Sequence, residues 1–132
     1  MLLLDERILA DGRHARTWAE RDGANVMITD DEADLRATIS IAGLDRVIGR
    51  IGKPIDAAIV SGADPAECLD LTDGHRLRRL RYHAPVDATG RDYLVWERDG
   101  QEPLAALGTA VAMMLRFIAL RLDPQKTEGR EG

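Results

Sequence analysis

The sequence contains few cysteines, histidines and aromatic residues, and these shortages exclude several kinds of site. Cys68 is the only cysteine among 132 residues, so the chain can form neither an intramolecular disulfide nor a multi-cysteine metal site. The three histidines lack the spacing of a zinc site, and only 4% of the residues are aromatic. We therefore expect no metal and no cofactor, and we expect Cys68 to be a small buried apolar residue.

The chain also lacks the patterns of a secretion signal and of a membrane span. Its first residues turn acidic at Asp5 and lack the basic start, longer apolar core and cleavage site of a signal peptide. The longest apolar run lies in segment 103–122 and is interrupted at Arg116 after about 12 residues, whereas a membrane-spanning helix needs about 20. The sequence predicts a soluble, cytoplasmic protein with no membrane partner.

Lysine is nearly absent, because Arg outnumbers Lys by 16 to 2, and the formal net charge is -5. An acidic surplus would repel a phosphate backbone, so we expect no nucleic-acid partner. The charge is unevenly placed, since residues 1–74 carry a net -7 and residues 75–132 a net +2. This asymmetry permits a local anion site in the second half, or a first half that masks a basic partner.

Asp-Gly pairs occur four times and indicate tight turns, because glycine supplies the positive φ angle that such turns need. In segment 35–41, apolar and polar residues alternate, which predicts a strand with one buried and one solvated face. Short segments that suit β-strands lie between the predicted turns, so the sequence predicts a strand-rich chain. The strand-compatible segments are 14–20, 25–29, 35–41, 57–60, 77–83 and 93–97.

Three other segments have helical patterns. After Gly43, apolar residues recur at helical spacing until Gly52. Asp64, followed by proline, is typical of a helix start, and Gly74 would end that short helix. The strongest pattern predicts one long apolar helix over residues 103–122.

Together these elements predict an α+β fold, with a mainly antiparallel, hairpin-rich sheet packed on one long apolar C-terminal helix. An alternative is a small bent sheet or barrel wrapped around that helix. We expect residues 1–122 to form a single globular domain and residues 123–132 to be a flexible tail.

The C-terminal helix is apolar on nearly all sides and must be covered on nearly all sides. One stripe holds large side chains and suits the sheet. A second stripe of small residues would let another helix approach closely, which predicts a homodimer or a protein partner. The predicted interface residues are Ala105, Gly108, Thr109, Ala112 and Arg116.

The densest charge feature is segment 75–83, His-Arg-Leu-Arg-Arg-Leu-Arg-Tyr-His, whose element type the pattern leaves open. On a strand, alternate guanidinium groups could grip a phosphate or carboxylate. A solvated edge strand whose charges pair with the acidic half is the alternative. The candidate ligand- or partner-binding residues are Arg76, Arg78, Arg79 and Arg81, and the weak catalytic candidates are His75 and His83.

Segment 30–34, Asp-Asp-Glu-Ala-Asp, has carboxylates at alternate positions but lacks the following glycine and later glutamate of a calcium loop. We expect it to be a solvated connecting turn.

None of these segments has the residue types and spacing of a known catalytic motif. We therefore expect a non-enzymatic protein-binding or assembly module that self-associates through the C-terminal helix. One alternative is a small acid–base enzyme, a lyase, isomerase or hydrolase, that acts on an anionic small molecule bound by Arg79 or Arg81. Another is an immunity- or chaperone-like regulator that masks a basic partner.

Overall fold

Two antiparallel sheets and three helices make up residues 1–62, 66–72, 74–82 and 91–122, the part of the chain that this computed structural model describes. The first sheet runs β1 (Leu2–Ile8), β2 (His14–Asp22), β3 (Asn25–Asp30), β4 (Leu35–Ser40). The second has the order β5 (Lys53–Pro54), β9 (Leu104–Leu107), β8 (Arg91–Glu97), β7 (Arg76–Tyr82), β6 (Cys68–Asp70). The helices are α1 (Ile41–Ile51), α2 (Ala57–Ser61) and α3 (Gly108–Leu122).

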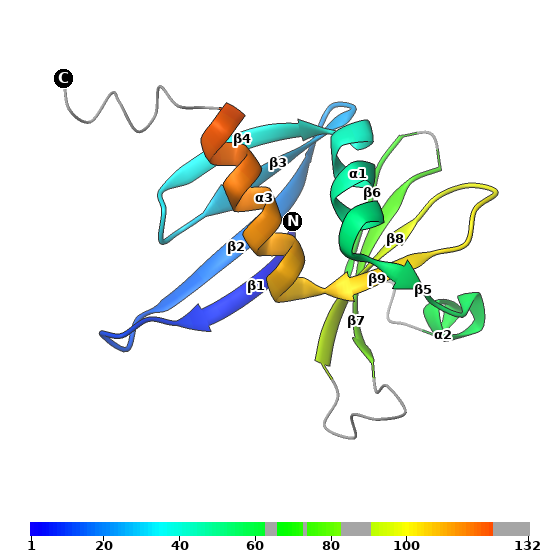
Figure 1. Ribbon diagram of the computed structural model, residues 1–132, viewed down its shortest axis with the longest axis horizontal. Coiled ribbons are helices and arrows are strands. Elements are labelled where there is room, and N and C mark those ends of the chain that lie inside the picture. The colour runs from blue at the N-terminus through cyan, green and yellow to red at the C-terminus, as the bar shows by residue number, and fades with distance from the viewer. Residues whose placement is uncertain (63–65, 73, 83–90, 123–132) are drawn as a thin grey trace.

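The α+β class is confirmed, and the C-terminal helix packs on a sheet as predicted. Figure 1 shows α3 lying across the first sheet, with α1 beside it and the second sheet beyond α1. The strands are divided between two open sheets rather than one, and over the described ranges neither sheet closes into a barrel. The sheets also touch directly, through β1 with β7 and β2 with β6.

The main hydrophobic core lies where α1, α3 and the facing sides of both sheets meet. Leu44, Leu77 and Trp96 are fully buried there, and Leu115 of α3 is only 1% exposed. A smaller cluster under α2 covers the opposite face of the second sheet and contains Ile55, Val60 and Val95. Because the second sheet is covered by apolar clusters on both faces, apolar and polar residues alternate less regularly along its strands than along β4.

The predicted turns are confirmed at the glycines of all four Asp-Gly pairs, whose φ angles are +87°, +61°, +70° and +71° in chain order. The helix predicted after Gly43 is also present. It begins earlier, at Ile41, because the Ser40 hydroxyl accepts a hydrogen bond from the Gly43 N–H and caps the helix directly after β4.

One predicted element begins later than expected, and two are wrong. The C-terminal helix begins at Gly108 rather than at residue 103, because Leu104–Leu107 hydrogen-bond as a strand between β5 and β8. Segment 57–60 is helical, since the Asp56 carboxylate accepts from the Ala58 N–H and caps α2. The predicted helix from Asp64 to Gly74 overlaps strand β6, and its start lies outside the described residues.

Strand β1 was not predicted at all, and segment 75–83, whose type the sequence left open, contains the strand Arg76–Tyr82. Among the described residues, no helix has the combined length and apolar character needed to cross a membrane.

Candidate functional site

The four arginines predicted as a binding cluster lie on β7, and their side chains alternate between its two faces. On one face, Arg76 Nε lies 2.5 Å from Asp70 Oδ1, and this hydrogen bond raises the pKa of Arg76. On the same face, Arg78 is buried, and its Nε donates to Glu97 Oε1 at 2.9 Å. Both guanidinium groups are therefore bound to carboxylates of the chain itself.

On the other face, Arg79 and Arg81 share one carboxylate. Arg79 NH2 lies 2.5 Å from Asp92 Oδ2, and Arg81 Nε lies 3.1 Å from Asp92 Oδ1. An incoming anion would have to compete with Asp92 for both groups. The pairing argues against an anion clamp, but the alternative prediction of an edge strand paired with the acidic half is also wrong: β7 lies between β8 and β6, and only Asp70 among these carboxylates belongs to residues 1–74.

Of the two catalytic candidates, only His75 belongs to the part of the chain that the structure describes. His75 is half-buried, with Nδ1 3.2 Å from the Thr72 carbonyl oxygen and its ring centre 5.2 Å from that of Trp96. His83 lies outside the described residues. A cavity of about 380 Å³ beside His75 is lined by both carboxylates and guanidinium groups, so it has no single sign of charge. Among the described residues, no three metal-ligating side chains form a cluster.

The five predicted interface residues do not form one exposed helix face. Ala105 lies in β9 and Gly108 is buried, whereas Thr109 is exposed. Ala112 is fully buried in the main core. The stripe of small residues therefore faces the protein's own sheets, and it is the short side chains that let α3 approach them closely. Gly108 shows this directly, because a Cβ there would lie 2.7 Å from the Leu4 carbonyl oxygen.

Arg116, the fifth of those residues, belongs to a network around Asp30. Arg116 NH1 lies 3.4 Å from Glu32 Oε1 and 3.8 Å from Asp30 Oδ1. Arg7 NH2 donates to Asp30 Oδ1 and to Glu32 Oε1, each at 2.9 Å. Two cations from β1 and α3 thus hold the end of β3 and the turn after it.

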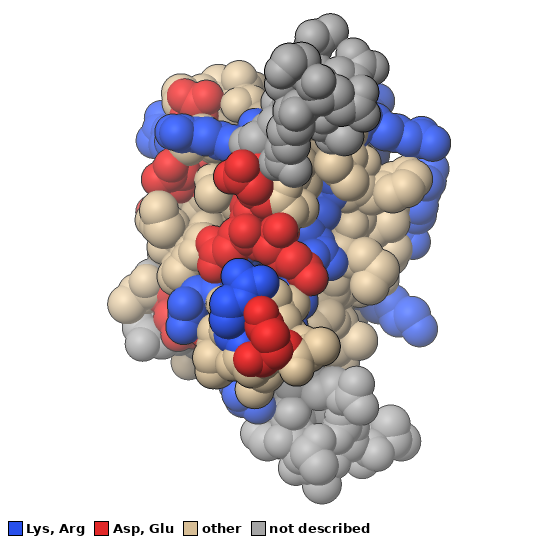
Figure 2. Space-filling model, turned by 90° about the vertical axis from the view of Figure 1, so that its left-hand side faces the viewer, with Lys and Arg blue, Asp and Glu red and all other residues tan. Residues whose placement is uncertain are grey.

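Asp30 corrects the prediction that segment 30–34 is wholly solvated, since its side chain has no exposed surface. It accepts hydrogen bonds from the Thr17 hydroxyl at 2.5 Å and from the Ala33 N–H at 2.9 Å. Burial alone would raise the pKa of Asp30, but the hydrogen bonds from Thr17, Ala33 and Arg7 outweigh it, and the pKa is lowered from its ordinary 3.8. Figure 2 shows acidic side chains gathered across the middle of the side of the molecule where this turn lies.

No protein family, curated protein or solved structure matches the chain. The candidate sites therefore rest on the geometry of this chain.

The outer face of α3 carries an apolar surface that includes none of the predicted interface residues. Met113, Phe117 and Leu120 are 61%, 57% and 42% exposed. Their spacing of four and three residues places them along one helix face, which we call the α3 ridge. Arg121 lies over the Phe117 ring, with Cζ 4.9 Å from the ring centre.

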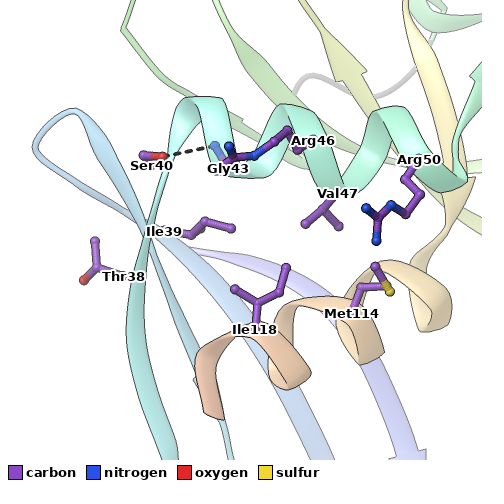
Figure 3. Close-up of a pocket in the computed structure, with 9 residues that line it drawn as sticks. All are labelled: Thr38, Ile39, Ser40, Gly43, Arg46, Val47, Arg50, Met114 and Ile118. Carbon is purple, nitrogen blue, oxygen red and sulfur yellow. Dashed lines mark hydrogen bonds between the residues drawn. The ribbon is translucent and has the colours of Figure 1, made fainter. Parts of the chain in front are cut away.

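A groove of about 370 Å³ runs beside this ridge, between α1, α3 and the end of β4. Figure 3 shows Val47 of α1 and Met114 and Ile118 of α3 directed into it, with the guanidinium group of Arg50 reaching toward α3. Arg46 lies one turn earlier on the same side of α1. The sequence analysis missed both arginines, although two arginines four residues apart on a predicted helix were a usable signal.

Proposed function

We propose that the protein is a non-enzymatic assembly module that pairs with a second copy of itself through the α3 ridge. The observation that carries this proposal is the exposure of three large apolar side chains in line on one helix. An apolar patch of roughly 300 Å² is as large as the largest one on many monomeric proteins, and such patches are often functional. We place the module in a reducing compartment, the cytoplasm, because Cys68 is its single cysteine.

The charges beside the ridge favour a second copy as the partner. One flank is acidic, because Asp31 and Asp34 are exposed in the β3–β4 turn beside Glu32, which is itself paired with Arg7 and Arg116. The other flank is basic, with Arg46 and Arg50 on α1 and Arg121 near the end of α3. A two-fold axis parallel to α3 places the acidic flank of each copy opposite the basic flank of the other. An axis perpendicular to α3 places like charges together. The proposed dimer therefore has parallel α3 helices.

The ridge alone is too small for a tight dimer. With about 200 Å² for each fully exposed side chain, its three residues offer roughly 300 Å² per copy. A stable interface buries about 800 Å² on each partner, so the flanks must contribute much of the contact. We expect dissociation in the micromolar range and weaker association at high salt, because exposed charge pairs are screened.

Light scattering coupled to size-exclusion chromatography, over a concentration series at low and moderate salt, tests the proposal. The wild type should approach the dimer mass as concentration rises, and Phe117→Glu should stay monomeric. Ile8→Glu is the matched control, since Ile8 is a 69% exposed apolar residue outside the ridge, and it should dimerise like the wild type. A wild type that remains monomeric at several hundred micromolar would refute self-association.

Cysteine cross-linking in a Cys68→Ser background tests the helix direction. Across a parallel axis, equivalent residues face each other, so Met113→Cys and Leu120→Cys should each form disulfide-linked dimers. The two positions are about 10 Å apart along the helix, whereas a disulfide spans about 4.4–6.8 Å between Cα atoms. An antiparallel pair would instead cross-link a mixture of the two variants, and it would contradict the proposed flank pairing.

A further inference from the structure

We propose that the groove between α1 and α3 binds a small amphipathic anion, an oxyanion head on an alkyl chain of roughly eight to ten carbons. This site does not require self-association, but it shares Arg46 and Arg50 with the basic flank of the proposed dimer, so a bound anion and the partner's acidic flank would compete for these two arginines. The occupant follows from three properties of the groove: its size, its apolar floor and the charge at its rim.

The groove has the size and lining of a small-molecule site. Its volume of about 370 Å³ lies near the lower end of the range of such sites, about 300–1,000 Å³, and suits about a dozen non-hydrogen atoms. Ile39 and Val47, only 6% and 3% exposed, belong to the core and form its floor. Met114 and Ile118 form the wall on α3.

The rim carries positive charge that the described chain does not neutralise. Arg46 and Arg50 are exposed, and neither has a hydrogen bond or ion pair with any residue that the structure describes. The arginines of β7, by contrast, are all bound to carboxylates. The nearest acid in the sequence of α1, Asp45, is engaged elsewhere, because its Oδ1 accepts from Trp96 Nε1 at 2.8 Å.

No residue lining the groove is acidic, and neither β4 nor α3 contains an acidic residue in its described length. On a chain whose net charge is -5, this is an isolated basic site above an apolar floor. Guanidinium groups bind carboxylates and phosphates through paired N–H donors, so either head group suits the rim.

The floor also indicates where the alkyl chain lies. A narrow crevice between β4 and α3 adjoins the groove, shares Ile39 and Ile118 with it, and continues toward Leu115 and Ala119. The crevice is too narrow for water, and apart from Thr38 its lining is apolar. A methylene group is wider than a water molecule, so the chain stays within the groove: we place the head group at Arg50 and Arg46 and the chain against Ile39, Met114 and Ile118.

Isothermal titration calorimetry of the full chain in low-salt buffer tests the site with four probes. Octanoate and octyl phosphate carry the two possible heads, 1-octanol has the same chain without charge, and acetate has the head without the chain. The charged eight-carbon probes should bind at least tenfold more tightly than either 1-octanol or acetate, since each buried methylene contributes up to about fourfold. Stronger binding of octanoate or of octyl phosphate identifies the preferred head.

Arg46→Gln and Arg50→Gln should each weaken binding of the charged probes about tenfold, as expected for the loss of one charge-assisted hydrogen bond. Arg21→Gln is the matched control, because Arg21 is an exposed arginine on β2, outside the groove, and it should bind like the wild type. Circular dichroism checks that each variant is folded.

Three results would overturn the proposal: equal binding of octanoate and 1-octanol, equal binding of octanoate and acetate, or unchanged binding by the two groove variants. A tetraglutamate peptide is the competing probe. If it binds through Arg46 and Arg50 while octanoate does not, the groove docks an acidic polypeptide and the inference is wrong.

Discussion

Replacing Asp30 by asparagine should destabilise the protein more than any other single loss of an acidic charge in the β3–β4 region. The carboxylate is inaccessible to solvent and accepts hydrogen bonds from Thr17, Arg7 and the Ala33 N–H. An amide presents only one oxygen to these donors, and its NH2 group turns a donor toward another donor. At least one buried donor then loses its partner.

The size of this effect follows from the contacts. An unsatisfied buried donor costs about 1–3 kcal/mol, and removing the charge leaves Arg7 and Arg116 without the anion between them. Both arginine side chains are 21% exposed and keep Glu32 as a partner, so the loss of the Asp30 charge between them destabilises the protein only moderately. We expect Asp30→Asn to lower the free energy of unfolding by about 3 kcal/mol.

Urea denaturation followed by tryptophan fluorescence measures this change, because Trp96 is fully buried in the main core. With a denaturant dependence of about 1.5 kcal/mol per molar urea, the midpoint should fall by about 2 M. Asp31→Asn is the control: Asp31 is exposed, accepts only from the Arg16 N–H among the described contacts, and should cost under about 1 kcal/mol. Equal losses for the two variants would refute the reasoning.

The stability difference between the wild type and Asp30→Asn should depend on pH in a defined direction. The pKa of Asp30 is lowered below 3.8 in the folded protein, so the folded state releases this proton more readily than the unfolded state. The contribution of the carboxylate is therefore complete above the unfolded pKa and is lost as pH falls through the lower, folded pKa. The stability advantage of the wild type over Asp30→Asn should be constant above about pH 5 and shrink below about pH 4. An advantage that grows on acidification would contradict the assigned charge state.

Two further predictions concern α3 and its approach to the sheets. Ala112→Glu should unfold the protein or lower its free energy of unfolding by more than about 4 kcal/mol, because it buries a charge in the core. Thr109→Glu, on the exposed side of α3, should be tolerated. Thermal unfolding followed by circular dichroism distinguishes the two variants, and a stably folded Ala112→Glu would show that α3 is packed differently. Gly108→Ala should lower the free energy of unfolding by about 1–3 kcal/mol, because the new Cβ would meet the Leu4 carbonyl oxygen. Gly49→Ala has open space around it in α1 and should raise the free energy of unfolding by up to about 1 kcal/mol. Chemical denaturation measures both changes, and effects of the same sign would contradict the packing.

Local chemistry predicted the turns and the clearest strand correctly. Glycine tolerates the positive φ angle that a tight turn requires, and the alternation in segment 35–41 needs only one buried face, so both signals are local. The sequence failed where pairing across the fold decides the element. Leu104–Leu107 reads as helix when taken with the residues after it, but hydrogen bonds to β5 and β8 make it a strand.

The candidate sites were less predictable than the fold. The arginines of β7 are dense in the sequence, yet Glu97 and Asp92, which pair with Arg78 and Arg79, lie 19 and 13 residues away. Only the hairpin of β7 and β8 brings them together. The spacing of Arg46 and Arg50 predicts that both lie on one helix face, but only the packing of α1 beside α3 shows that this face borders a groove.

Strand β9 passes directly into α3, so the backbone that completes the second sheet continues, without an intervening loop, into the helix that covers the first. Neither sheet can detach without moving this junction. Native-state hydrogen exchange should therefore show slow amides of β2 and β8 opening with the same free energy, as one cooperative unfolding unit. A molecule that holds α3 in place would then protect both sheets from exchange at once.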